Sequence, residues 1–366
     1  MKDRYLKYDV LRAAAIAMVL LGHISAYMVI NFPDPTSADF FVSNIFNGFR
    51  RGASVPIFLM LTGALLLNED KAFNTREFYN KSLKSIIMLL IFWLACYGVF
   101  YAFILPLLLG NAINLKDFID YILTFKGSDY PHLWYLFMTI GLYISMPVLR
   151  IFARRENRVY VLGFIILSAI LKFLPHTLNF LTLSYTPTLE KFINKFGVEY
   201  LTRFSVYVLT GWYLANFKLD KSKRLGLYAL GVILSVIATT CVRIFIADIP
   251  DIRDYLYATY SLNLLVSGAA FFVFISSICG DKLTKNNSVI KTLSNTSFGV
   301  YAVHVIILEL LTRVIMPYNK FNLLNDSPFA RPLLYIIILF ALIYFISLAL
   351  VLILSKFNLF RKFLRG

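Results

Sequence analysis

Long apolar stretches recur along the whole chain, and they constrain its fold more than any other feature. A helix needs about 20 apolar residues to cross the hydrocarbon core of a bilayer. Ten stretches of the 366-residue chain meet or approach that length: 8–30, 41–67, 83–108, 132–150, 158–174, 200–217, 225–246, 255–278, 296–317 and 332–355. Because 59% of the residues are hydrophobic and only 15% are charged, the composition excludes an ordinary soluble domain. The sequence therefore predicts an all-α polytopic integral membrane protein of about ten transmembrane helices.

The basic residues gather in alternate loops. They cluster at the N-terminus, in the loops at 71–84, 150–158, 218–224 and 282–291, and in the C-terminal tail, whereas the intervening loops carry few. By the positive-inside rule, both termini are then predicted to be cytoplasmic, in agreement with an even number of spans. The net charge of +16 is thus a topology signal, and we expect a lipid bilayer and no nucleic acid as partner.

We expect a single transmembrane domain over residues 1–366, with no appended soluble domain. The first span carries no small-residue cleavage signature and should stay as an anchor. Two loops on the predicted outer side contain amphipathic segments, at 118–125 and 189–196, with apolar residues at helical spacing. Loop helices packed on the bundle and interfacial helices that roof an external site both fit this pattern.

The first span carries three ionisable side chains, which are costly inside a membrane and therefore point to function. Arg12 and His23 are eleven residues apart, so they fall within about 20° of one helix face and differ in depth by about 16 Å. Asp9 precedes Arg12 by three residues, close enough to orient it by a charge-assisted hydrogen bond. An interfacial ion pair with a packing histidine is the alternative.

The second span contains adjacent arginines, Arg50 and Arg51. If the span begins near Gly52, they lie at the outer interface and snorkel to the headgroups. If it begins near Phe41, they lie inside and face a polar cavity. Pro56 can break the backbone at this point, and Ser54 supplies a nearby hydroxyl.

Further polar groups occur in the fourth and ninth spans. His132 and Trp134 lie at the predicted outer end of the fourth, where a solvated histidine and an aromatic belt are expected. In the ninth span Tyr301 and His304 share a face. Glu309 lies at a depth similar to that of His23, and its nearest predicted partner is Arg313, four residues on.

Four motifs occur in order along nearly the whole chain. They are Y-D-x-L-R-A followed by a histidine (Tyr8 to His23), S-V-P-I-F-x-x-x-T-G (Ser54 to Gly63), H-L-W-Y-L (His132 to Leu136) and S-F-G-V-Y-x-x-H (Ser297 to His304). Together they resemble the acyltransferase family 3 membrane proteins. The resemblance implies about ten helices and transfer of an acyl group, usually acetyl, to a hydroxyl of an envelope glycan in a bacterial inner membrane.

The resemblance, in which Arg12 and His23 match essential residues of the family, combines with the positions of the other polar residues to give each an expected role. Acetyl-CoA would be a co-substrate, with no tightly bound cofactor and no metal. His23, Arg12 and Asp9 form the expected catalytic set, with His23 as general base or as transient acyl carrier. Donor or oxyanion binding falls to five residues: Arg50, Arg51, Ser54, Tyr301 and His304. The acceptor side is assigned to three: His132, Trp134 and Glu309.

One alternative class uses the same polar residues without chemistry. A transporter or flippase of an envelope precursor would also line a route with ionisable groups, although no inverted repeat is apparent. Binding of CoA distinguishes the two classes. The sequence leaves open the acceptor, the role of each arginine in the second span, and whether the chain forms a homo-oligomer.

Overall fold

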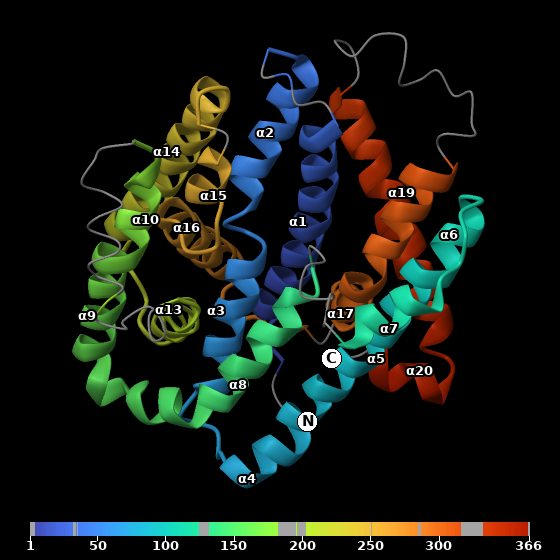
Figure 1. Cartoon of the computed structure of the whole chain (residues 1–366). Helices are drawn as coiled ribbons and strands as arrows, with labels where there is room; N and C mark the ends of the chain where they lie inside the picture. The colour runs from blue at the N-terminus through green and yellow to red at the C-terminus, as the bar shows by residue number, and fades with distance from the viewer. Residues whose placement is uncertain are drawn as a thin grey trace. The chain divides into compact units, whose positions relative to one another are not determined.

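The computed structural model describes residues 4–31, 34, 36–123, 132–181, 195, 203–249, 251–284, 287–315 and 332–364. Within these residues the named elements are all helical (Figure 1). A lone antiparallel bridge joins Tyr5 to Leu283. Nine helices of the described residues are long and apolar enough to cross a membrane. The predicted all-α polytopic fold is confirmed.

The helices form two compact units, and the first contains Met1–Lys71 and Val148–Ser294. Its helices are α1 (Leu6–Asn31), α2 (Ala38–Arg50), α3 (Val55–Leu66), α9 (Arg158–Ser168), α10 (Leu174–Leu178), α13 (Ser205–Asn216), α14 (Lys221–Phe245), α15 (Ile252–Leu256) and α16 (Leu262–Cys279). Helix α1 packs against α2, α3 and α16, and α14 packs against α2 and α16 (Figure 1). The second span, which consists of α2 and α3, thus packs along α1.

The second unit contains Ala72–Pro147 and Asn295–Gly366. Its helices are α4 (Thr75–Phe78), α5 (Lys84–Val99), α6 (Leu105–Leu108), α7 (Leu115–Leu123), most of α8 (Trp134–Phe152), most of α17 (Ser288–Glu309), α19 (Pro332–Leu354) and α20 (Asn358–Leu364). The C-terminal α20 contacts α5, because Trp93 Nε1 donates to the Phe363 carbonyl at 3.1 Å. The rings of Phe92 and Phe363 stack with centroids 4.0 Å apart.

Nine of the ten predicted spans match the nine long helices, and the sixth, at 200–217, differs. Its described helix, α13, has 12 residues, about 18 Å of helix and less than the hydrocarbon core. Residues 200–202 lie outside the described residues. Gly63 and Gly211 allow α13 to approach α3 closely, since a Cβ on either would overlap a backbone carbonyl of the other helix.

One of the two amphipathic loop segments is described in part. Helix α7 covers residues 115–123 and packs on α5, so residues 118–123 of the first segment are helical and lie on the helices of their own unit, whereas residues 124 and 125 lie outside the described residues. The second segment, at 189–196, lies outside the described residues except for Lys195.

Candidate active site

Asp9, the first of the three ionisable residues of the first span, is a buried carboxylate. Asp9 is 2% exposed and receives two hydrogen bonds from Arg4, from Nε to Oδ2 and from Nη2 to Oδ1, both 2.6 Å. The hydroxyls of Thr284 and Ser294 donate to the same carboxylate at 2.7 and 2.6 Å. Asp9 therefore fastens the start of α1 to the segment that leads from α16 into α17.

The direct hydrogen bond predicted between Asp9 and Arg12 is wrong. Their closest atoms, Arg12 Nη1 and Asp9 Oδ1, are 3.9 Å apart, which is an ion-pair distance too long for a hydrogen bond. Instead Arg12 Nη1 donates to Ser294 Oγ at 3.2 Å, and that hydroxyl donates in turn to Asp9. Arg4 takes the place predicted for Arg12, because it reaches the carboxylate from the chain before the helix.

His23 lies deeper in α1 and is half-buried. It follows Gly22, and the residue that packs against this turn comes from the second span. A Cβ added to Gly22 would overlap the guanidinium of Arg50. The glycine therefore makes room for the guanidinium of Arg50 on the turn of α1 that carries His23.

The second span is broken where its arginines lie. Helix α2 ends at Arg50 and α3 begins at Val55, with Pro56 in its first turn. The Ser54 hydroxyl donates to the Arg51 carbonyl at 2.7 Å, so it satisfies one backbone group freed by the break. The C-terminal end of α2 carries a partial negative charge, which favours the two cations placed there.

The two arginines point to different partners. Arg50 Nη2 donates to Asn47 Oδ1 at 2.7 Å, and its Nε is buried with no hydrogen-bond partner. Arg51 donates from Nη1 to the carbonyl of Tyr257, and its guanidinium carbon lies 5.1 Å from the centre of that ring. Arg51 thus holds the loop before α16, whereas Arg50 contacts the His23 turn.

The second unit contains its own buried polar cluster. His132 is 2% and His304 1% exposed, and their ring centres are 5.6 Å apart. The Tyr301 hydroxyl donates to the His132 carbonyl at 2.5 Å, and His304 Nδ1 donates to the Tyr301 carbonyl at 2.6 Å. His132 is therefore buried, contrary to the solvated position expected at the rim.

This cluster unites residues that the sequence assigned to different sides. Tyr301 and His304 were expected on the donor side and His132 on the acceptor side, yet their rings are neighbours. Trp134 follows at the start of α8, with its ring 6.5 Å from Tyr135. Glu309 accepts from Arg313 Nη1 at 3.1 Å, so the predicted pairing within the helix is confirmed.

The sequence matches the model of a known protein family. A family model described as an acyltransferase domain, the acyltransferase family 3 model, matches residues 5–354. The chain belongs to this acyltransferase family. Comparison with curated proteins and with solved structures gives no match. The chain is a multi-pass membrane acyltransferase.

The ionisable groups described above in this acyltransferase are carboxylates, imidazoles and guanidiniums. Within the described residues no group of three or more His, Cys, Asp or Glu side chains is arranged to hold a metal ion. The first unit instead carries an imidazole, that of His23, and the guanidinium of Arg50, which packs against the same turn of α1. Such groups can move a proton and stabilise an oxyanion in an acyl transfer. Sequence reasoning missed Arg4, Thr284 and Ser294.

We expect Asp9→Asn to destabilise the protein and to weaken donor binding. Removing the carboxylate charge leaves Arg4 and Arg12 without their shared counter-charge, and breaking a buried pair costs about 3 kcal/mol. Thermal unfolding in nanodiscs should show a lower Tm, and the KM for the acyl donor should rise. Asp9→Glu should restore part of both.

The matched control removes ion pairs at the surface. Arg155 contacts Asp70 at 2.6 Å and Glu69 at 3.0 Å, and its own side chain is about half exposed, so Arg155→Gln should leave Tm and KM nearly unchanged. Equal effects of Asp9→Asn and Arg155→Gln would contradict the role assigned to the buried carboxylate.

Proposed function

We propose that this acyltransferase moves an acetyl group from cytoplasmic acetyl-CoA to a hydroxyl of a cell-envelope polysaccharide or lipid-linked sugar, in the inner membrane of a bacterium. The whole chain would act as one transmembrane domain. The observation that carries the proposal is the contact between the Arg50 guanidinium and the Gly22–His23 turn. It puts the Arg50 guanidinium against the turn of α1 that carries His23, a residue that can accept a proton.

The chemistry requires a base and an oxyanion partner. The acceptor oxygen attacks the thioester carbonyl, its proton passes to His23, and the C–S bond breaks as CoA leaves as a thiolate, which takes up that proton. Products are the acetyl ester and free CoA. Arg50, with an unsatisfied buried N–H, would donate to the carbonyl oxygen as negative charge develops there.

A second sequence of steps uses the same groups. His23 itself attacks the thioester, the C–S bond breaks, and the thiolate of CoA takes up the imidazole proton and leaves as the thiol, which gives an acetyl-imidazole. The acceptor hydroxyl then attacks the acetyl carbonyl, the N–C bond to the imidazole breaks, and the hydroxyl proton returns to His23. This route carries only acetyl across the membrane. Both routes place Arg12, joined to Asp9 through Ser294, on the donor side of His23.

The acceptor follows from the motifs rather than from the site. Within the family, the motifs around His23, Ser54, His132 and His304 most resemble those of the enterobacterial common antigen O-acetyltransferase. An envelope polysaccharide or a lipid-linked sugar is therefore the acceptor to test first. The cluster of Tyr301, His304 and His132, together with Trp134 and Glu309 of the same unit, would shape the route of one substrate.

The test is transfer by purified protein. With labelled acetyl-CoA and envelope glycan in nanodiscs, we expect label in the glycan and one CoA released per acetyl transferred, measured by mass spectrometry and a thiol assay. CoA should also raise the Tm, by mass action on the folded state.

The competing transporter function gives the opposite results. A flippase would move glycan without consuming acetyl-CoA. If neither CoA nor acetyl-CoA raises the Tm, and no CoA is released with any envelope glycan, the proposed function is wrong.

A further inference from the structure

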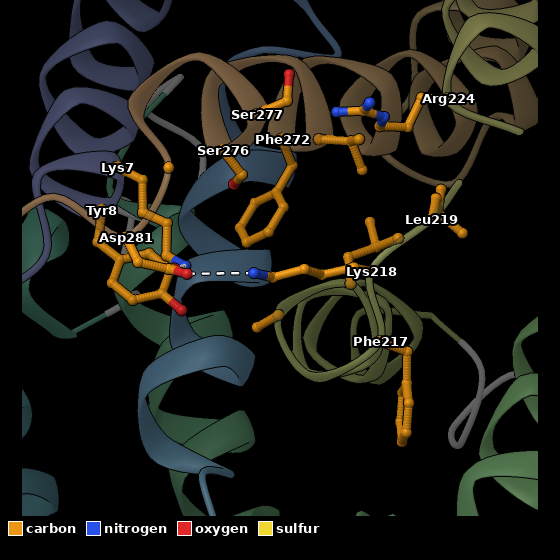
Figure 2. Close-up of a pocket in the computed structure, with 14 residues that line it drawn as sticks. Lys7, Tyr8, Phe217, Lys218, Leu219, Arg224, Phe272, Ser276, Ser277 and Asp281 are labelled. Atoms are coloured by element: carbon orange, nitrogen blue, oxygen red, sulfur yellow. Dashed lines mark hydrogen bonds and ion pairs between the residues drawn. The ribbon is translucent and has the colours of Figure 1, made fainter. Parts of the chain in front are cut away.

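A pocket of about 330 Å³ opens at one end of the first unit. It lies between the start of α1, the end of α13, the start of α14 and the end of α16 (Figure 2). These helix ends carry the basic loops that the positive-inside rule assigns to the cytoplasm. The volume is at the lower limit of small-molecule sites, so the pocket would hold part of a ligand as large as a coenzyme.

The pocket is lined by an excess of cations. Lys7, Lys218 and Arg224 line it together with one carboxylate, that of Asp281, which leaves two positive charges uncompensated among these four groups. Asp281 Oδ1 lies 2.7 Å from Lys7 Nζ and its Oδ2 lies 3.2 Å from Lys218 Nζ. The two lysines lower the pKa of Asp281, so the carboxylate stays ionised at neutral pH.

Two buried polar atoms of the pocket lack a hydrogen-bond partner. They are Arg224 Nε and Ser276 Oγ. A buried donor left unsatisfied is costly, more so on a charged group, and a ligand oxygen would satisfy it. Figure 2 shows Lys218 stretched across the pocket toward Asp281, with the Phe272 ring between them and the guanidinium of Arg224. Lys218 is exposed and can turn from Asp281 to a ligand.

The pocket lies at the N-terminal end of the face of α1 that carries Arg12 and His23. Tyr8 lines it, and Tyr8, Arg12 and His23 fall within about 60° of one helix face. His23 is 15 residues beyond Tyr8, a rise of about 22 Å. A ligand anchored in the pocket can thus extend a long arm past Arg12 toward His23.

We propose that this pocket binds the phosphate groups at the nucleotide end of the acyl-CoA donor, through Lys7, Lys218, Arg224 and Ser276. The assignment rests on the proposed function. Asp281 holds the lysines in place and competes with the phosphates for them. A phospholipid headgroup offers the same phosphate chemistry, and the test below separates the two sources.

The test compares binding of CoA with binding of acetyl-pantetheine, which lacks the nucleotide. In the Lys218→Gln/Arg224→Gln protein, we expect the Kd for CoA to rise about tenfold or more and the Kd for acetyl-pantetheine to stay the same. The donor KM should rise with kcat at saturating donor unchanged. Lys221→Gln removes an exposed charge from the first turn of α14 outside the pocket and should change none of these.

A variant that binds CoA more tightly tests the assignment in a way that misfolding cannot mimic. Asp281→Asn removes the competing carboxylate and frees both lysines, so CoA should bind a few-fold more tightly. A damaged protein would not produce this result.

The remaining outcomes overturn the assignment. If wild-type protein binds CoA but the double variant binds it equally well, the pocket is not the nucleotide site and the proposed function stands. Equal weakening of CoA and acetyl-pantetheine also rejects it. If the double variant instead loses only the stabilisation given by phosphatidylglycerol over phosphatidylcholine nanodiscs, the pocket holds a lipid headgroup. Failure of wild-type protein to bind CoA rejects both proposals.

Discussion

His23→Gln is expected to reduce acetyl transfer by about 10³-fold, the range that loss of a general acid–base group produces. Glutamine keeps a polar side chain of similar size that can still hydrogen-bond, but it can neither take up the acceptor proton nor carry an acetyl group. The loss should therefore fall on kcat, with the Kd for CoA and the Tm close to wild-type values. Initial rates of CoA release in nanodiscs, together with thermal unfolding, measure this.

The choice of glutamine separates chemistry from packing. If His23 only packs against a neighbouring helix, glutamine should preserve most of the activity, since a hydrogen bond inside the membrane contributes about 1 kcal/mol. His176 provides the control. It is buried in α10, and its Nε2 lies 3.0 Å from the Asp254 carbonyl, a bond that the glutamine amide can also make. His176→Gln should thus retain activity, and similar kcat values for the two variants would remove His23 from the catalytic set.

The fold followed largely from apolar length, because this signal acts locally along the chain. A stretch of twenty apolar residues has few alternatives to a spanning helix. The exception is α13, where Gly211 and the buried run from Val206 to Trp212 pack around the second span. There close helix packing, rather than length, sets where the helix lies, and one sequence does not reveal that.

The site was predictable only along a single helix. The stripe of Arg12 and His23 follows from the pitch of α1, so it could be read directly. Ser294 and Thr284 contact Asp9 across more than 270 residues, and no local pattern announces such contacts. Arg4 precedes the apolar run and carried only a topology signal, although its spacing of five from Asp9 allows the pair.

Helical periodicity alone does not predict where the side chains of the adjacent arginines point. Their directions depend on where α2 ends, and the backbone leaves helical geometry between Arg51 and Ser54. A shift of one residue in where the helix ends decides whether a side chain contacts α1 or the loop before α16. Gly22 was a usable signal, because a glycine beside a polar residue in a span permits close approach of another group.

The second large effect should therefore come from Gly22. We expect Gly22→Ala to reduce kcat about 100-fold, the loss typical of removing an oxyanion donor, with little change in Tm. The added Cβ meets the guanidinium of Arg50, which is the end of a flexible side chain and can move away without disturbing the backbone. Arg50→Lys should give a similar loss, because an ammonium cannot reproduce the planar donor fork.

Two comparisons make the prediction specific. Gly163→Ala in α9 adds a Cβ where no atom lies within 4 Å, and alanine favours helix over glycine, so activity should be unchanged. Arg51→Lys should lower the Tm, since it weakens the hold on the Tyr257 carbonyl, and should spare kcat in the protein that remains folded. If Arg51→Lys instead reduces kcat at an unchanged Tm while Gly22→Ala stays active, then Arg51 and not Arg50 serves the reacting carbonyl, and the guanidinium of Arg50 only packs against the turn that carries His23.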